Sequence, residues 1–240
     1  DLAMQLSNPV AALVSVPFQF NSDRDIGPAN DGQRYLLNIQ PVIPFTLNSD
    51  WNLISRTIVP LIDQKDIVPG EGSQSGIGNI VQSLFLSPAR PTDSGIIWGA
   101  GPVFLLPTAS NSWLGTDKWG AGPTAVALKQ QGGWTVGTLA NHIWSVGGNS
   151  SDPDISTTFI QPFVTYATPT KTTFAINTES TYDWKANQWT VPINFNIAQL
   201  LRVGEQIVQV GGGVRYWAAG SNLAPEGWGF RLTMTLLFPR

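Results

Sequence analysis

Few side chains in this sequence are of types that catalyse reactions, and none stands in a catalytic motif. His142 is the only histidine, and it lies near Asn141 and Trp144. A lipid hydrolase could assemble Ser, His and Asn on a barrel wall, but no serine here lies in a nucleophile motif. We therefore predict no catalytic residue and keep a barrel enzyme as a remote alternative.

Carboxylates that could bind a divalent cation occur in two segments, Asp23, Asp25 and Asp31 in one and Asp152 and Asp154 in the other. Their spacing matches no calcium-binding loop, so solvated carboxylates in surface loops are expected. The chain also has no cysteine that could ligate a metal. The sequence predicts neither a metal site nor a cofactor.

The composition indicates a surface that water does not fully cover. The 240 residues are 42% hydrophobic and only 12% charged, whereas about a quarter of the residues in soluble domains are charged. The chain contains no run of about 18 apolar residues, the length that a membrane helix needs. A closed β-barrel is therefore the membrane-spanning form left. The net charge of −3 and the scattered basic residues argue against a nucleic-acid partner.

The stretch from Gly229 to Phe238 alternates almost without error. Phe230, Leu232, Met234, Leu236 and Phe238 share one face, and Arg231, Thr233, Thr235 and Leu237 share the other. A soluble sheet would turn the apolar face to a core, whereas a membrane barrel turns it to lipid.

The same alternation begins at Val14 and recurs in about twelve segments. They are 14–21, 34–47, 51–62, 77–87, 95–106, 119–130, 134–145, 157–167, 172–182, 189–197, 206–217 and 229–238. Tryptophans at many segment ends are typical of an aromatic girdle at the membrane surface. We interpret the chain as all-β: residues 14–240 form a transmembrane up-and-down antiparallel β-barrel of about twelve strands. A soluble sandwich with aromatic core residues is the alternative.

Connectors alternate between short and long, as periplasmic turns and external loops of outer-membrane barrels do. The short ones are 48–50, 88–94, 131–133, 168–170 and 202–205, and the long ones are 22–32, 63–76, 107–118, 146–156, 183–188 and 218–227. This parity predicts a bacterial outer-membrane location with both termini in the periplasm. The start at Asp1 without a cationic segment favours a mature chain whose signal peptide has been removed.

Residues 1–13 do not alternate, and apolar side chains recur there at helical spacing, interrupted by a proline. Thirteen helical residues would span about 20 Å, close to the roughly 25 Å apolar band of a barrel. We predict a short broken helix that plugs the lumen; a disordered periplasmic tail is the alternative. The plug residues are Leu2, Met4, Leu6, Pro9 and Leu13.

If the apolar faces look outward, the lumen receives a mixed set of side chains. The polar members are Asn38, Gln40, Arg56, Asn177, Glu179, Asn194, Asn196, Arg215 and Arg231, and the apolar members include Ile54, Ile58, Phe85, Leu105, Phe159 and Phe163. Such a lining suits small organic ligands. The apolar groups could equally serve only to pack the plug, and the arginines could simply pair with Glu179.

Glycine is concentrated on the inward face of three consecutive strands. These residues are Gly99, Gly101, Gly120, Gly122 and Gly137. Bare backbone there predicts clearance for the plug or for a substrate. Prolines inside the strands each remove a ladder donor, and we hypothesise that some open a lateral exit through the wall; simple bending of the strands is the alternative.

Several stretches carry a resemblance that extends over the whole chain. They are Asn8–Gln19, Leu37–Pro44, Asp50–Pro60, Ser83–Pro88, Trp119-Gly120-Ala121-Gly122-Pro123, Gln161–Val164 and Leu237-Phe238-Pro239-Arg240. The sequence resembles a family of bacterial outer-membrane channels labelled phenol-degradation meta-pathway proteins or transporters. The resemblance implies a twelve-stranded barrel with an N-terminal segment in its lumen and no catalytic residues. Outer-membrane proteins commonly end on an aromatic residue, whereas Pro239 and Arg240 follow Phe238 here.

We therefore expect a channel or transporter that takes up small hydrophobic or aromatic molecules, with the lateral exit as one version. A narrow general channel for small solutes or ions is the alternative. The expected partners are outer-membrane lipid, an unidentified small hydrophobic substrate, and detergent in crystals. A monomer is expected, and no patch stands out from the lipid-facing band that would fix the oligomeric state.

Overall fold

The structure, a computed structural model, describes residues 2–239; Asp1 and Arg240, which begin the predicted plug and end the predicted barrel, lie outside the described residues. A helix of five residues, α1 (Leu2–Leu6), precedes fifteen strands. The strands are β1 (Val14–Ile26), β2 (Gly32–Ile39), β3 (Val42–Thr46), β4 (Trp51–Lys65), β5 (Ser73–Ile77), β6 (Ile80–Pro88), β7 (Ile96–Leu106), β8 (Lys118–Gln131), β9 (Trp134–Gly148), β10 (Ser156–Ala167), β11 (Thr172–Thr178), β12 (Ser180–Asp183), β13 (Gln188–Val203), β14 (Gln206–Ala219) and β15 (Gly227–Phe238).

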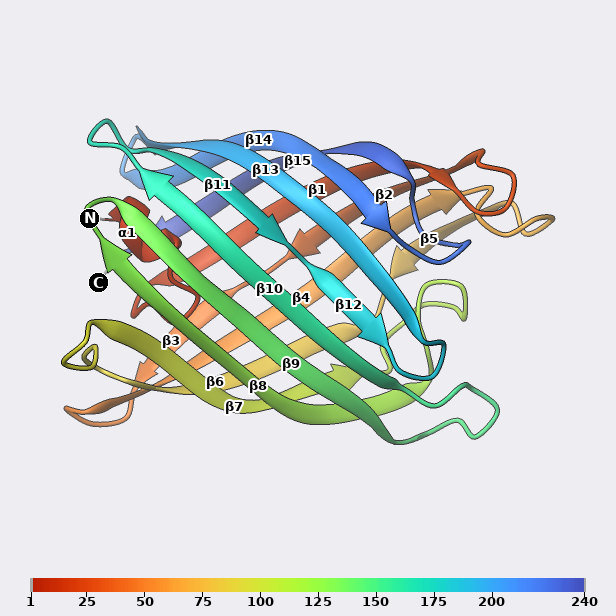
Figure 1. Ribbon diagram of the computed structural model, residues 1–240, viewed down its shortest axis with the longest axis horizontal. Helices are drawn as coiled ribbons and strands as arrows, with labels where there is room; N and C mark the ends of the chain where they lie inside the picture. The colour runs from red at the N-terminus through yellow and green to blue at the C-terminus, as the bar shows by residue number, and fades with distance from the viewer. Residues whose placement is uncertain (1, 240) are drawn as a thin grey trace.

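The strands close into a single antiparallel barrel (Figure 1). β1 pairs with β15, which joins the first and last strands, and neighbours in sequence pair around the rest of the wall, including β9 with β10. β2 and β3 lie end to end, as do β5 and β6, and β11 and β12. The wall therefore has twelve strand positions, and the prediction of a closed barrel of about twelve strands is confirmed.

β2 with β3 and β11 with β12 were each expected to be one strand, whereas β5 falls largely in the connector expected at 63–76. The break between β2 and β3 falls at Gln40 and Pro41, and the break between β11 and β12 falls at Glu179. The strand register places Thr178 opposite Pro162 and Glu179 opposite Pro192. Because proline has no N–H to donate, the ladder is interrupted at these places. The interruptions are local, since both halves of β11 and β12 still pair with β10 and β13.

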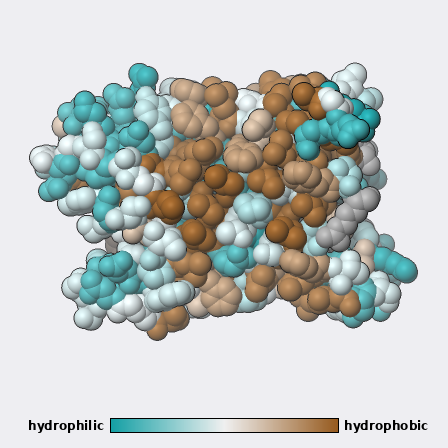
Figure 2. All heavy atoms as spheres, turned by 180° about the vertical axis from the view of Figure 1, so that it is seen from behind, coloured by the Kyte–Doolittle hydropathy of each residue, from teal (hydrophilic) through white to brown (hydrophobic). Residues whose placement is uncertain are grey.

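The outer surface of the barrel carries the apolar residues of the alternating pattern. Phe230, Leu232, Met234 and Phe238 are all exposed. Figure 2 shows hydrophobic residues gathered in a band between two more hydrophilic ends. Lipid in contact with this band gives these side chains the apolar surroundings that water would not. Exposed tryptophans occur where strands begin or end, among them Trp119, Trp134, Trp144, Trp189 and Trp228.

Both ends of the described chain, residues 2 and 239, lie at one end of the barrel, which we call the terminal end; the opposite one is the far end (Figure 1). Strands reach further into the far end than the sequence indicated. β1 continues to Ile26, and β4 continues to Lys65, which pairs with Ser73. The connectors expected at 22–32 and 63–76 are correspondingly shorter. The only helix among residues 2–239 is too short to cross a membrane.

Candidate functional site

The lumen is formed by the residues that alternate with the lipid-facing ones, and the register of the strands sets them in rows across the wall. Arg231 lies opposite Asn21 on β1 and opposite Gly213 on β14. Of the residues that the sequence assigned to the lumen, Ile54, Phe85, Asn194, Arg215 and Arg231 are the most deeply buried, each at most 4% exposed. Arginine and asparagine at such burial face the barrel interior because a lipid-facing charge would be costly.

Two arginines and two carboxylates form an ionic cluster on one side of the lumen. Arg231 donates to both carboxylate oxygens of Glu179, at 3.1 and 2.8 Å, and its Nε donates to Asn21 at 2.7 Å. Arg215 donates to Asp23 Oδ2 at 3.3 Å and lies 4.0 Å from Glu179. Paired two-point contacts of this kind are the stronger form of charged hydrogen bond.

Asp23 is a lumen residue that the sequence did not reveal, since it was expected in a solvated loop. Its side chain is 1% exposed, and Trp217 Nε1 donates to its Oδ1 at 2.9 Å. The Arg215 guanidinium also lies over the Trp217 ring, 4.7 Å from its centre. Gly229 separates Arg215 from Asp23 on the intervening strand, and a Cβ there would lie 2.6 Å from Asp23 Oδ1. Extending the inward parity of β1 by two residues would have found Asp23.

Amide side chains continue this polar side of the lumen. Asn194 Nδ2 donates to Asn177 Oδ1 at 2.9 Å, and Asn196 lines a cavity with Arg231. The Oδ1 atoms of Asn194 and Asn196 are buried and have no hydrogen-bond partner among the described residues. Buried polar atoms normally have partners, so this side of the lumen retains unused capacity for a hydrogen-bond donor.

The opposite side of the lumen is an apolar cluster centred on Phe85. Its buried members are Val10, Ile54, Phe85, Val126, Leu128, Leu139 and Phe163, with Phe159 packed against them. Leu105 lies nearby on β7, in register with Gly120. Part of the apolar lining that suggested a ligand site therefore packs within the wall and against the N-terminal segment.

The N-terminal segment lies inside the barrel at the terminal end (Figure 1). Leu2 and Leu6 pack beside Leu13, and the backbone carbonyl of Met4 accepts a hydrogen bond from Gln130 Nε2 at 2.6 Å. Pro9 lines the cavity beside the segment. The helix ends at Leu6, and turns at Ser7 and Asn8 follow, so it is shorter than thirteen residues.

Val10 and Ala11, which lie outside the expected plug set, are also buried. Val10 is 5% exposed and packs against the Phe85 cluster, and Ala11 is 9% exposed and packs with Leu13. The helical spacing in the sequence included Val10, together with Leu2, Leu6 and Leu13.

The clearance glycines divide into two kinds. A Cβ on Gly99 would lie 3.1 Å from Val10 of the N-terminal segment, so this glycine gives the segment room. A Cβ on Gly101 or Gly122 would collide with a backbone carbonyl of the neighbouring strand. Gly120 and Gly137 face side chains of adjacent strands, Ile143 and Leu128 among them. Four of the five therefore make room for the wall itself, which differs from the expected clearance for a plug or substrate.

Three cavities of about 230, 240 and 190 Å³ lie along the lumen. The first adjoins the N-terminal segment, the second reaches Glu179 and Arg231, and the third contains Asn38 and Ile58. Gln40 and Gln161 line all three, so the cavities adjoin one another at these two residues. We call this position the waist.

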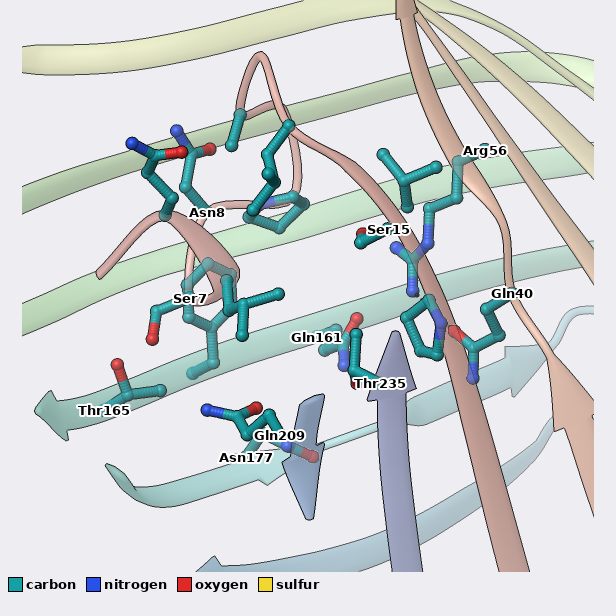
Figure 3. A pocket seen from close by; sticks show the side chains of 18 residues that line it. Ser7, Asn8, Ser15, Gln40, Arg56, Gln161, Thr165, Asn177, Gln209 and Thr235 are labelled. Atoms are coloured by element: carbon teal, nitrogen blue, oxygen red, sulfur yellow. Dashed lines mark hydrogen bonds between the residues drawn. The ribbon is translucent and has the colours of Figure 1, made fainter. Parts of the chain in front are cut away.

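Arg56 reaches the waist from β4. Its Nη2 donates to Gln40 Oε1 at 3.0 Å. In Figure 3 the side chains of Arg56 and Gln40 extend toward Gln161 and Thr235 across the cavity. The waist is therefore lined by groups that donate and accept hydrogen bonds, with the aromatic ring of Phe163 beside them in the first cavity.

His142 lies on the outer face of β9, away from the lumen residues. Its Nδ1 is 2.7 Å from Thr158 Oγ1, its Nε2 is 3.3 Å from Ser156 Oγ, and its ring lies 4.1 Å from the Trp144 ring. No acidic group among the described residues pairs with this imidazole. A histidine that activates a serine is usually oriented by such a partner.

The carboxylates of the loop between β9 and β10 bind the neighbouring loop. Asp152 Oδ2 accepts hydrogen bonds from the backbone N–H of Asp117 at 2.7 Å and the Thr116 hydroxyl at 2.9 Å, which lower the pKa of Asp152. Lys118 donates to Asp154 at 3.1 Å and lowers the pKa of Asp154. Among residues 2–239, no group of three or more His, Cys, Asp or Glu side chains is arranged to hold a metal ion.

No protein-family model and no curated protein sequence matches the chain. Three solved structures share its fold. An outer-membrane channel from Pseudomonas putida F1 is 16% identical with a TM-score of 0.71, over 95% of this chain and 96% of that chain. The NanC porin is 10% identical with a TM-score of 0.57, over 94% and 100%. Outer membrane phospholipase A from Escherichia coli is 12% identical with a TM-score of 0.52, over 98% of both chains.

At these identities the likeness establishes the fold alone. The neighbours include two channels and one enzyme by name, so the fold accommodates both activities. The chain has the closed barrel fold of outer-membrane proteins, and the family label suggested by the sequence stays a prediction.

Proposed function

We propose that this chain is an outer-membrane channel for small organic molecules with an aromatic or other apolar part, and that residues 2–13 restrict the path in the conformation described. The observation that carries the proposal is the series of three adjoining cavities inside a closed barrel. A closed barrel with an apolar outer band fits a membrane-spanning role. The channel and the porin among its structural neighbours support the same class of function.

The lining of the third cavity favours an organic solute. Ile58, Leu139 and Phe159 lie there beside Asn38 and Asn141. Apolar walls with a few polar groups are typical of sites for small organic molecules. An engineered apolar cavity of about 150 Å³ binds benzene, so a cavity of about 190 Å³ is of the size that holds a single ring.

The first cavity favours the second candidate, a narrow channel for small polar solutes. It is lined by amides and hydroxyls, including Gln161, Asn177, Gln209 and Thr235. These groups could replace the water of a hydrated solute. Aromatic alcohols and acids satisfy both linings, whereas a sugar would leave the apolar third cavity without a matching surface.

A lateral exit remains part of the proposal, and the wall from β6 to β9 is its candidate position. The pairing of β6 with β7 skips residues 84 and 85 opposite Gly101 and Pro102. The pairing of β8 with β9 skips Gly122 and Pro123. Fewer ladder bonds make these seams easier to part than a regular ladder.

The proposal is tested in planar bilayers and liposomes with the full chain and a variant lacking residues 2–13. We expect low conductance from the full chain and a large rise after the deletion, with liposome entry faster for benzyl alcohol than for arabinose. Unchanged conductance after the deletion would show that the N-terminal segment does not restrict the path. Faster entry of arabinose would favour the general polar channel.

The lateral exit has a separate test because the chain has no native cysteine. Leu86 and Ala100 face each other across β6 and β7 beside the skipped residues, so Leu86→Cys with Ala100→Cys places a disulfide across this seam. We expect oxidation to slow transfer of an apolar solute into the bilayer and reduction to restore it. Equal transfer in both states would exclude this seam as the exit.

A further inference from the structure

The lumen holds more positive than negative charge. Apart from charged residues at strand ends, such as Lys118, six charged side chains lie on its inward rows: Asp23, Arg34, Arg56, Glu179, Arg215 and Arg231. Four are guanidinium groups and two are carboxylates. The overall chain charge is −3, so the positive lumen is a local property that the composition hides.

The two carboxylates are already paired with two of the arginines. Glu179 binds Arg231 at 2.8 Å, and Asp23 binds Arg215 at 3.3 Å. Arg34 lies opposite Asp23 in the strand register, but it forms no ion pair within 4.0 Å in the described part of the chain, and its Nε is buried without a partner. Arg34 is therefore the first of two guanidinium groups that lack a carboxylate.

Arg56 is the second, and it is the one on the solute path. Its hydrogen bond to Gln40 Oε1 at 3.0 Å leaves most of its five N–H donors unused. No carboxylate from residues 2–239 lies within 4.0 Å of its guanidinium group. A charge of this kind in a lumen of low dielectric constant attracts an anion more strongly than it would in water.

The surroundings of Arg56 supply further recognition groups. Arg56 lines the first and third cavities and stands between them at the waist. The Gln161 side chain faces it across the cavity (Figure 3) and makes no hydrogen bond to any described residue. Ile58 and Phe159 lie beside Arg56 in the third cavity. The guanidinium group of Arg56, the amide of Gln161 and the apolar side chains of Ile58 and Phe159 thus line the same part of the lumen.

We propose that Arg56 and Gln161 form an anion-binding site at the waist, and that the molecules this channel carries are small organic anions in which a carboxylate adjoins an aromatic ring. The inference rests on the proposed channel function and specifies its substrate class. The planar guanidinium group binds a carboxylate through two parallel hydrogen bonds, while Ile58 and Phe159 contact the ring. Arginine side chains in a narrow pore also favour passage of anions over cations.

Ion selectivity provides the first test. The reversal potential of the full chain in a planar bilayer under a KCl gradient should show a preference for Cl⁻ over K⁺. Arg56→Gln should lower the permeability ratio several-fold, toward the value of an unselective pore. Arg90→Gln makes the same charge change in an exposed turn and should leave the ratio unaltered. A cation-preferring full chain, or equal ratios for Arg56→Gln and Arg90→Gln, would overturn the proposal.

Binding provides a second test that does not depend on transport. Titration calorimetry of the detergent-solubilised full chain should detect benzoate and not its neutral and cationic analogues, benzyl alcohol and benzylamine. Arg56→Gln should abolish the benzoate signal. Arg56→Lys keeps the charge without the planar fork, so it should preserve anion preference and weaken benzoate binding. Equal binding of benzoate and benzylamine by the full chain would refute the site.

Heat-modifiable migration on gels shows whether each variant has folded. If Arg56→Gln does not fold, the comparison of the three ligands on the unmodified chain still decides the outcome. Different experimental results would refute the channel function and the waist site. Absence of conductance before and after deletion of residues 2–13 would refute the channel, whereas conduction without anion preference would refute the waist site alone.

Discussion

The two sides of the lumen are built in different ways. The Phe85 side is closed by packing, since Ile54 and Phe85 are 0% exposed and Val10 of the N-terminal segment packs against them. The Glu179 side is joined by charge-assisted hydrogen bonds to Arg231 and leaves buried oxygens such as Asn194 Oδ1 without partners. A packed apolar cluster has no unused hydrogen-bonding groups, whereas the polar network retains donors and acceptors that a solute could pair with.

This contrast indicates where a solute would be recognised. The apolar side packs against the N-terminal segment. Under the proposed function, the polar side and the waist would supply the groups that distinguish one solute from another. Substitutions on the apolar side should therefore affect stability and channel closure, whereas substitutions on the polar side should affect selectivity.

The largest effect is expected on the packed side. Phe85→Ala removes a fully buried ring and should lower the free energy of unfolding by about 3–5 kcal/mol, measured by denaturant unfolding in detergent micelles. Phe45→Ala is the control, because Phe45 is 48% exposed on the lipid-facing surface. An equal loss from the two variants would show that the Phe85 cluster is not a packed core.

A somewhat smaller loss is expected on the charged side. Glu179→Gln leaves Arg231 and Arg215 with a single carboxylate, Asp23, between them. Removing one partner of a buried ion pair costs about 3 kcal/mol or more, and the partial exposure of Glu179 (21%) reduces this. We expect a loss of about 2 kcal/mol together with stronger anion preference. Glu205→Gln, in an exposed turn, should change neither quantity.

Weakening the contact between the N-terminal segment and the packed side should change how often the channel opens. Val10→Ala removes the equivalent of two methylenes from the Phe85 cluster, about 1.5 kcal/mol. If this contact holds the segment in place, the ratio of open to closed time in single-channel recordings should rise about tenfold. Ala12→Gly alters an exposed neighbour and serves as the comparison. An unaltered ratio of open to closed time in Val10→Ala would show that this contact does not keep the channel closed.

The smallest effect is expected in the loops outside the barrel. Because the pKa of Asp152 and that of Asp154 are lowered in the folded chain, their contacts are fully present above the unfolded pKa of about 3.9. They are lost as pH falls through the lower folded values. Hydrogen exchange at the Asp117 amide should be constant from neutral pH down to about 4, after correction for intrinsic rates, and should quicken as the pH falls below this value. Asp152→Asn should show fast exchange already at neutral pH, whereas Asp93→Asn should not.

The sequence predicted the barrel well because a period of two is imposed on every strand by the lipid outside. It predicted that in-strand prolines such as Pro41 interrupt the ladder, but it did not predict the break at Glu179, which depends on Pro192 in the neighbouring strand. It placed Arg215, Arg231 and Glu179 in one lumen, but the pairing of Asp23 with Arg215 depends on strand register. The waist was also missed, since Gln161 and Arg56 lie far apart in the sequence.

The Asp23 contact has a consequence for assembly. Asp23 on β1 meets Arg215 and Trp217 on β14 across the bare backbone of Gly229 on β15, so these groups come together only when the two ends of the chain have joined. The fluorescence of the Trp217 indole should therefore report the joining of β1 and β15. Its emission should shift when β1 pairs with β15, later than the emission of the tryptophans on β8 and β9.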